Sequence, residues 1–307
     1  MPTPTKIIDA HNHVGYLGRD VDWIVNEMDQ LGIERTWLLS WEIAPYEDAP
    51  GNHSSFTPLG LRADGTHGGT SLERQLEAYR KYPDRFILGY SPHPAIGDAP
   101  ALLRAAHAMY GIKICGEWGH RLPFDDPRCI EVFKVAGELK LPVVLHIDID
   151  YLKIDGKSTF QPTFLGGSVE RLERALKACP ETIFVGHAPA FWREISGDAD
   201  DDPSSYPRGP IRGRGKLYDL FDNNPNLRAD LSAGSGLFAL QRDPVHAKQF
   251  LLRYADRLHF GRDQFGDDLL KFLASLDLPQ DVADKIYWQN AEQLTISKST
   301  FIIMPSS

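Results

Sequence analysis

Short apolar runs alternate with amphipathic runs along the whole chain, and this alternation limits the possible folds more than any other feature of the sequence. Eight runs rich in β-branched and aromatic residues predict strands at 6–11, 36–40, 86–90, 112–115, 143–147, 182–186, 227–231 and 257–261. Stretches with apolar residues at i, i+3 and i+4 predict helices at 21–31, 72–82, 99–109, 128–139, 169–178, 217–223, 245–254 and 267–276. A strand followed by a helix, repeated eight times, predicts an α/β fold: a single (β/α)8 TIM barrel.

The residues that end the predicted helices, and the lack of a dividing linker, favour one domain spanning residues 1–307. Glycine or proline ends several predicted helices, at Gly32, Pro83, Gly111, Pro142, Pro180 and Pro225. No linker or internal repeat divides the chain of 307 residues. Three long connections, 41–70, 148–167 and 188–215, all follow strands. In a barrel such loops lie on the C-terminal face, where active sites are built.

Composition excludes several classes of partner. The chain carries 33 basic and 42 acidic side chains, a net charge of −9, whereas nucleic acids and anionic membranes attract basic surfaces. Neither a GxGxxG nor a GxxxxGKS nucleotide motif occurs, and no apolar window has the length of a membrane span. The three scattered cysteines fit a reducing cytosol. We therefore expect a cytoplasmic protein that acts on a small molecule.

Two histidines stand together at the end of the first predicted strand, in the run IIDAHNH. Residues i and i+2 of a strand point to the same side, about 6.6 Å apart, so His11 and His13 can converge on one ion. Asp9 shares their parity one layer deeper, and we interpret it as a hydrogen-bond partner for a ligand imidazole. The spacing alone also fits two histidines with ordinary hydrogen bonds at a strand end.

Three further polar residues stand at the ends of later predicted strands. His146 ends the apolar run LPVVLHI, His187 follows the sixth strand and Asp263 follows the eighth. Because the C-terminal ends of barrel strands share one face, these side chains are expected beside His11 and His13. Imidazoles and carboxylates are the ligands of divalent ions such as zinc, so the set predicts a metal centre.

The fourth predicted strand continues as GIKICGEWGHR, in which Lys113, Cys115 and Glu117 share a parity that we interpret as inward. Glu117 is expected to contact substrate or to cap a loop. Lys113 is expected to pair with a barrel carboxylate such as Asp9. Either residue could instead hold a second metal ion.

Aromatic residues directly after strands are typical of the walls of a concave apolar pocket. On this basis three tryptophans are predicted to contact substrate: Trp41, Trp118 and Trp192. His93 is a further candidate for the pocket. Arginines near the strand ends could bind a substrate carboxylate, although salt bridges are their commoner fate: Arg121, Arg193 and Arg262.

With these residues in place, the sequence resembles the amidohydrolase superfamily, whose metal signature is HxH on strand one, His on strands five and six, and Asp on strand eight. The runs YGIKI, DDPRCIEVFKVAGELKLPVVLHI, VGHAPAFW, NLRADLSAGSG and HFGRDQFG are similar to the amidohydrolase-related branch that includes aminocarboxymuconate-semialdehyde decarboxylase. The resemblance extends from Lys6 to about Leu294.

This resemblance implies a (β/α)8 barrel that binds one divalent metal ion, most often zinc. It implies four metal ligands: His11, His13, His146 and Asp263. His187 would lie near the metal-bound water or the substrate. Binuclear members of the superfamily bridge two ions with a carboxylated lysine or a glutamate from strand four, a role open here to Lys113 or Glu117. Because barrels of this family often pair, a homodimer is a further expectation.

The predicted activity is hydrolysis of a C–N or C–O bond in a small organic substrate, carboxylate-bearing or cyclic, by a metal-activated water. Asp263 could take the proton of the water and pass it to the leaving group, while His187 holds the water or the oxyanion. The alternative is a non-oxidative decarboxylase, a lyase, in which the metal binds a substrate carboxylate. Decarboxylase relatives carry glycine-rich sequence after the sixth strand, where this chain has HAPAFW, and this difference favours the hydrolase.

Overall fold

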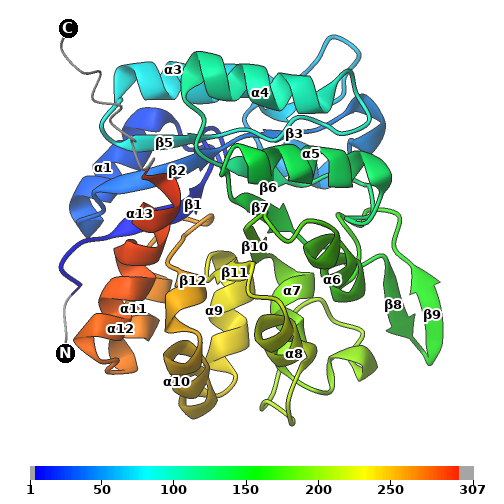
Figure 1. Ribbon diagram of the computed structural model, residues 1–307, viewed down its shortest axis with the longest axis vertical. Coiled ribbons are helices and arrows are strands. Elements are labelled where there is room, and N and C mark those ends of the chain that lie inside the picture. Colours follow the sequence, from blue (N-terminus) through cyan, green and yellow to red (C-terminus); the bar gives the residue numbers. More distant parts are fainter. Residues whose placement is uncertain (1–3, 297–307) are drawn as a thin grey trace, which may run out of the picture.

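Eight parallel strands alternate with helices in the computed structural model, which describes residues 4–296 (Figure 1). The strands are β1 (Ile8–Asn12), β2 (Arg35–Leu39), β5 (Phe86–Gly89), β6 (Cys115–Trp118), β7 (Val143–His146), β10 (Phe184–His187), β11 (Leu227–Asp230) and β12 (Leu258–His259). The helices that follow them are α1 (Val21–Leu31), α3 (Leu72–Lys81), α4 (Ala99–Tyr110), α5 (Pro127–Glu138), α6 (Val169–Ala178), α8 (Lys216–Asn223), α10 (Pro244–Arg253) and α11 (Asp268–Ser275).

Backbone hydrogen bonds close these strands into a ring. Strands β1, β2 and β5 pair in one parallel set, and β6, β7, β10, β11 and β12 in another. Between β5 and β6, Tyr90 N–H donates to the Ile114 carbonyl at 3.0 Å. Between β12 and β1, Ala10 N–H donates to the Phe260 carbonyl at 2.9 Å. The predicted (β/α)8 TIM barrel is thereby confirmed, whereas the prediction of one domain over 1–307 stays a prediction.

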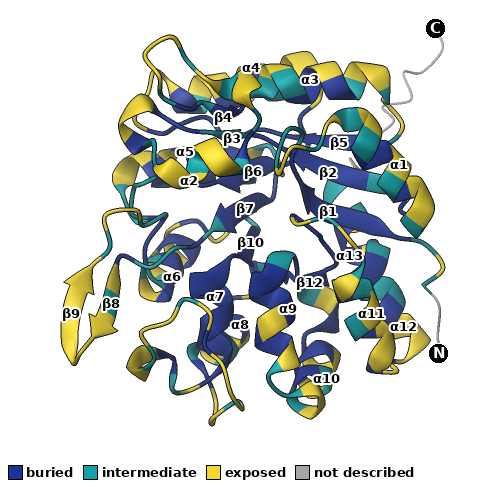
Figure 2. Ribbon diagram, turned by 180° about the vertical axis from the view of Figure 1, so that it is seen from behind, coloured by how far each residue is buried: buried dark blue, intermediate teal, exposed yellow. Residues whose placement is uncertain are grey.

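Side chains fill the barrel in two layers. A small inner cluster, mostly of residues from neighbouring strands, packs inside the ring: Ile8, Ala10, Trp37, Leu39, Ile87, Ile114, Val144, Val185 and Ala291. A larger outer cluster fills the space between the strands and the helices, whose inner faces are buried (Figure 2). The last helices, α12 (Gln280–Asp284) and α13 (Asn290–Thr295), follow α11, and Ala291 of α13 belongs to the inner cluster.

The three long connections contain structure that periodicity did not predict. The first holds α2 (Pro50–Ser55) and a short antiparallel pair, β3 (Trp41–Glu42) with β4 (Gly69–Thr70). The second forms a projecting hairpin of β8 (Tyr151–Ile154) and β9 (Lys157–Phe160), and the third holds α7 (Pro189–Trp192). An unpredicted helix, α9 (Ala233–Gln241), lies between β11 and α10.

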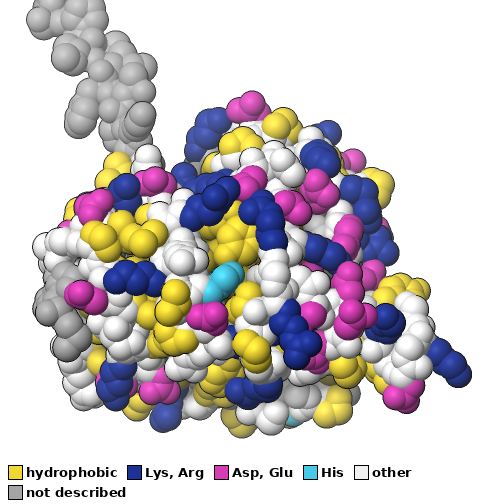
Figure 3. All heavy atoms as spheres, turned by 90° about the horizontal axis from the view of Figure 1, so that it is seen from below, with side chains coloured by type: hydrophobic (Ala, Val, Ile, Leu, Met, Phe, Trp, Pro, Cys, Tyr) yellow, Lys and Arg dark blue, Asp and Glu magenta, His cyan; other side chains and the backbone are white. Residues whose placement is uncertain are grey.

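The described surface carries charges of both signs. Figure 3 shows basic and acidic side chains interspersed over one face, with small apolar patches between them. None of the helices between residues 4 and 296 combines the length and apolar composition that a membrane crossing requires.

One buried carboxylate makes stability depend on pH. Glu194, 2% exposed, lies 3.8 Å from both Arg193 and Lys216, and burial raises its pKa to about 7. Because the folded-state pKa exceeds the unfolded value, this contribution is full below about pH 4.5 and is lost as pH rises through 7, by about 3 kcal/mol. We expect Glu194→Gln to flatten the fall in unfolding free energy between pH 5 and 8, measured by urea denaturation. An unchanged slope would contradict this assignment.

Candidate metal centre

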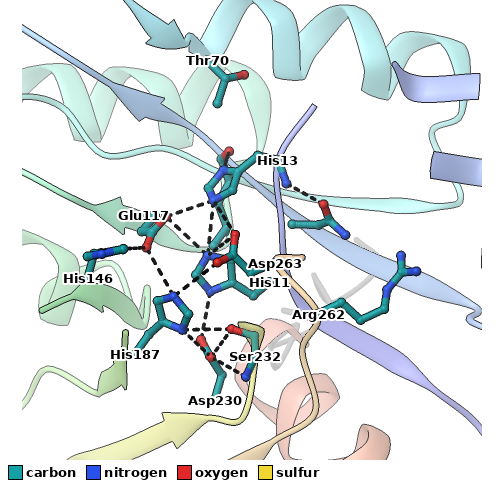
Figure 4. Close-up of polar contacts among 12 residues, drawn as sticks. His11, His13, Thr70, Glu117, His146, His187, Asp230, Ser232, Arg262 and Asp263 are labelled. Carbon is teal, nitrogen blue, oxygen red and sulfur yellow. Dashed lines mark hydrogen bonds and ion pairs between the residues drawn. The ribbon is translucent and has the colours of Figure 1, made fainter. Parts of the chain in front are cut away.

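Polar side chains from six strand ends converge at the C-terminal mouth of the barrel (Figure 4). They are His11 and His13 from β1, Glu117 from β6, His146 from β7, His187 from β10, Asp230 from β11 and Asp263 after β12. All are buried except His146, whose side chain is 13% exposed. The strands thus bring together the four predicted ligands, His187 and Glu117, and add Asp230; Lys113 is not among them.

An irregularity in β1 turns both histidines to the site. Ile8 and Ala10 point into the inner cluster, so simple alternation would place His11 on the opposite side. The register of β1 with β2 shifts between Asp9 and Asn12, however. The His11 carbonyl then accepts from Asp263 N–H at 2.9 Å, which fixes the two ligand-bearing segments side by side.

The geometry around His11 and His13 fits a cation. Their Nε2 atoms lie 3.3 Å apart, and Asp263 Oδ1 lies 3.6 Å from His13 Nε2 and 3.9 Å from His11 Nε2. Asp263 Oδ1 is buried and has no hydrogen-bond partner. Such an oxygen is costly unless something else compensates it. One ion reached by all three atoms would do so.

Hydrogen bonds to the far side of each ring orient these nitrogens. His13 Nδ1 donates to the Leu39 carbonyl at 2.7 Å, while His11 Nδ1 and His187 Nδ1 each donate to Asp230 at 2.9 Å. With the proton on Nδ1, the lone pair of each neutral imidazole lies on Nε2, toward the centre. Asp230 is a residue that the sequence analysis missed, although its position at the end of the seventh predicted strand was an available signal.

Glu117 lies in the middle of the centre. Its Oε2 is 2.9 Å from His13 Nε2, and its Oε1 is 2.7 Å from His146 Nδ1 and 3.8 Å from His187 Nε2. The register of β6 with β7 shifts between Cys115 and Trp118, and this shift turns Glu117 inward while Cys115 packs in the outer cluster. The predicted shared parity of Lys113, Cys115 and Glu117 is therefore wrong.

Lys113 cannot reach the metal centre. It precedes β6 and lines a cavity with Leu141, Pro142 and Leu294, at the amino-terminal end of the barrel. Four residues of extended chain, about 13 Å, separate it from Glu117. The predicted carboxylated-lysine bridge is thus excluded by position, because the ligands gather at the opposite end of the strands.

The pKa shifts at the centre indicate a site that positive charge would stabilise. Burial opposes ionisation, yet His11 and His146 hold the pKa of Glu117 well below its ordinary value. Burial likewise opposes protonation of His146, but Glu117 and Asp148 raise its pKa to about 10. Asp230 raises the pKa of His187 against the effect of burial. The buried carboxylates thus favour protonation of the imidazoles, and a divalent cation could supply this positive charge instead.

The predicted role of Asp9 is wrong, whereas Arg262 forms the salt bridges that were expected as its commoner fate. Asp9 accepts from the backbone and the Nε of Arg262, at 2.9 and 2.8 Å, and from the backbone N–H of His11 at 3.2 Å rather than from its imidazole. Arg262 also pairs with Glu27. Arg193 donates to the carbonyls of Ala199 and Asp202. Neither arginine is free to bind a substrate carboxylate.

Of the three tryptophans, the structure places Trp41 at the mouth. Its ring lies 5.0 Å from His146 and 5.9 Å from His13. Trp118 points outward and packs on Phe133 of α5, because neighbouring strand residues face opposite sides. Trp192 is fully buried, and its Nε1 donates to the Asp230 carbonyl at 3.0 Å. Substrate contact by Trp118 and Trp192 is therefore a wrong prediction.

This difference predicts two unequal effects on stability. Trp118→Ala should lower the free energy of unfolding by about 3–5 kcal/mol, because it opens a cavity in the outer core. Trp41→Ala removes a ring that is only half-buried and should cost less than half as much. Chemical denaturation of both variants tests the assignment, and equal losses would contradict it.

Two tyrosines also reach the mouth. The Tyr16 ring lies 5.8 Å from His13, and burial together with Asp263 and Glu117 raises the pKa of its hydroxyl. Burial, Asp148 and Asp263 likewise raise the pKa of Tyr206, which comes from the connection after β10. Sequence reasoning missed both, because loop residues carry no periodic signal.

A second histidine cluster joins three loops nearby. His93 Nε2 lies 3.1 Å from Glu47 Oε1, and His120 Nδ1 lies 4.0 Å from Glu47 Oε2. Ala95 N–H donates to His93 Nδ1 at 3.1 Å, which places the proton of this imidazole on Nε2, facing Glu47. A metal ligand would need the reverse tautomer. His93 therefore holds the loop of Glu47, and its place in the pocket stays a prediction.

Comparison with known proteins finds the same fold in solved structures of low sequence identity. No curated protein matches the chain. An uncharacterized TIM-barrel protein from Bordetella bronchiseptica is 17% identical with a TM-score of 0.61, over 94% of this chain and 98% of that one. A dihydroxybenzoic acid decarboxylase from Polaromonas sp. JS666, with bound manganese and the inhibitor 2-nitroresorcinol, is 16% identical with a TM-score of 0.55, over 94% and 96%.

A third structure, proposed to be a 2-pyrone-4,6-dicarboxylic acid hydrolase from Pseudomonas putida, is 14% identical with a TM-score of 0.57, over 95% of this chain and 98% of that one. At such identities the likeness establishes the barrel and leaves the reaction open. The family model described as amidohydrolase matches residues 8–294, nearly the whole chain. The chain therefore belongs to the amidohydrolase family.

Proposed function

We propose that this protein is a metal-dependent hydrolase that cleaves a C–N or C–O bond of a small organic substrate with water. One observation carries the proposal: two imidazole Nε2 atoms 3.3 Å apart face a buried, unpaired carboxylate oxygen of Asp263. The same carboxylate lies 3.5 Å from His187 Nε2 through its other oxygen. The Asp263 side chain thus belongs both to the candidate cation site and, with His187, to a pair of groups that can transfer a proton.

The residues that would hold the ion are His11, His13 and Asp263, with Glu117 as a further carboxylate ligand and His146 on its far side. When bound, a divalent ion there would supply Lewis-acid chemistry, polarising a substrate oxygen and lowering the pKa of a bound water from 15.7 toward about 7.

The proton chemistry falls to Asp263 and His187. Asp263 keeps a low pKa despite burial, because His11 and His187 favour its charged form, so it is ready to accept a proton from water. His187 is held through Nδ1 by Asp230, and its raised pKa favours the form that carries a proton on Nε2. That proton can stabilise negative charge on a substrate oxygen and can return to the leaving group.

Zinc is the proposed ion, since imidazole and carboxylate ligands suit it, although the same donor set also accepts manganese. We propose one ion at His11, His13 and Asp263. A second ion between His146 and His187 would make Glu117 the bridge, and the arrangement of its two oxygens toward separate histidine pairs supports this variant. The cytoplasmic location and the homodimer stay predictions.

A non-oxidative decarboxylase is the second candidate function. The observation that favours it is the similarity of the whole barrel to a decarboxylase that binds an aromatic inhibitor, together with the aromatic side chains Tyr16 and Trp41 at this mouth. In that case the ion and His187 would bind the substrate carboxylate.

Purified protein assayed against lactones, esters and amides, and separately against aromatic carboxylates for CO₂ release, distinguishes the two. We expect hydrolysis that is lost in His13→Ala and after chelation. Release of CO₂ abolished by His13→Ala, without hydrolysis of any member of the first panel, would overturn the hydrolase in favour of the lyase.

A further inference from the structure

Three rings form a continuous aromatic wall beside the metal centre: Tyr16, Trp41 and Phe56. Phe56 lies 5.5 Å from Tyr16 and 5.6 Å from Trp41, between ring centroids. Tyr16 and Trp41 in turn contact His13, and Trp41 also contacts His146. The backbone bridge between Tyr16 and Phe56 fixes the wall, so its rings are in place before a ligand arrives.

Asp148 adds a carboxylate to the same mouth. Its Oδ2 lies 3.4 Å from His146 Nε2, and its side chain is 39% exposed. Two backbone hydrogen bonds with Leu165, of 2.9 and 3.1 Å, hold this residue in place.

The charges at this mouth are negative. Glu117, Asp230 and Asp263 lie in the centre and Asp148 at its rim, so one divalent ion offsets only half of the four carboxylate charges when the imidazoles are neutral. Two of the three arginines near the strand ends make contacts within the protein, Arg262 with Asp9 and Glu27 and Arg193 with backbone carbonyls. Such a mouth repels a substrate carboxylate and attracts cations.

From this juxtaposition we infer the substrate class: a planar or aromatic molecule whose remote end carries a positive charge or N–H donors. Its ring packs on the aromatic wall, its remote group donates to Asp148, and the bond to be cleaved lies toward His187 and Asp263. The inference rests on the proposed hydrolase for the bond that is cleaved. Of the two substrate types predicted from the sequence, carboxylate-bearing or cyclic, this inference keeps the cyclic type and excludes the carboxylate-bearing type.

Three nearly isosteric probes test this substrate class without turnover: benzamidine, which is cationic, benzamide, which is neutral, and benzoate, which is anionic. Binding to the zinc-loaded full chain is measured by calorimetry. We expect benzamidine to bind about tenfold more tightly than benzoate, with benzamide between them, as one partly exposed charge pair allows.

The variant Asp148→Asn keeps the shape of the side chain and removes its charge. It should weaken benzamidine about three- to fivefold while benzamide changes less than about 1.5-fold, a split that a purely structural role would not produce. Asp84→Asn is the matched control, because it removes an equally single charge from an exposed residue before β5, at the other end of the barrel. It should change none of the three affinities.

Several results would overturn the inference: benzoate binding as tightly as benzamidine, an unchanged ratio in Asp148→Asn, or no binding of any probe up to its solubility limit. The failure of the hydrolase proposal is distinguishable. If benzamidine is preferred while no ester, lactone or amide is cleaved, the inferred substrate class is supported and the proposed hydrolase activity is rejected. If hydrolysis occurs but benzamidine is not preferred, the hydrolase activity is supported and the inferred substrate class is rejected.

Discussion

Replacing Asp263 by asparagine is expected to lower kcat by about 10²–10⁴-fold, the range of a lost general acid–base group. The amide keeps the size of the side chain, but it cannot take a proton from water, and it removes one negative charge from the group that would hold the ion. His187 would lose the carboxylate that lies 3.5 Å from its Nε2. Steady-state kinetics on the best substrate of the hydrolysis panel measures the effect.

Asp268→Asn is the control for this variant, because Asp268 is exposed at the start of α11, five residues farther along the chain. It should retain the kcat of the unmodified protein. If Asp263→Asn kept more than about a tenth of that activity, Asp263 would not be the group that transfers the proton.

The second large effect is expected at Asp230, whose two oxygens orient two imidazoles at once. In Asp230→Asn only one oxygen remains, and the amide N–H₂ faces a ring nitrogen that itself carries a proton. Where the amide N–H₂ faces His11, this imidazole must exchange its tautomer and move its proton to Nε2, where a metal ligand needs its lone pair. We expect metal affinity to fall about 10–100-fold, as is typical when such a partner is lost.

Competition with a chelator of known affinity measures this loss. Ser232→Ala provides the comparison, since Ser232 also donates to Asp230 but leaves both imidazole contacts intact. Its effect on metal affinity should be several-fold smaller than that of Asp230→Asn. Equal effects would mean that Asp230 acts through packing of the strand end, and the tautomer argument would fail.

Much of the barrel was predictable because apolar residues recur with a period of about 2 residues in strands and about 3.6 residues in helices. The range 21–31 was predicted and observed as α1, where Asp20 accepts from Trp23 N–H and Gly32 ends the helix with a left-handed backbone, φ 68°. Site residues were also predictable as far as they stand at strand ends, since the closed barrel brings those ends to one face.

What periodicity could not predict are departures from it. The register shifts in β1 and β6 reverse the expected parity, so that Ile8 faces the inner cluster while His11 reaches the site, and Glu117 turns inward while Cys115 does not. A single sequence contains no signal for such a shift, because it depends on pairing with the neighbouring strand.

The tryptophans also show that a single sequence does not reveal on which side of a strand a side chain lies. Trp41 and Trp118 both follow or end a strand, yet one faces the mouth and the other faces α5. One residue of displacement along a strand changes the side on which a ring lies. Contacts made by Tyr16, Phe56 and Asp148 depend on loop paths that are set by tertiary pairing, such as the bond of Asp148 N–H to Leu165.

The metal content of protein purified without added metal tests the central claim most directly, measured per chain for the unmodified protein and for His11→Ala/His13→Ala. We expect about one divalent ion per chain, absent from the double variant, and activity that disappears on chelation and returns when zinc is restored. An active protein without metal, or activity that survives complete chelation, would contradict it.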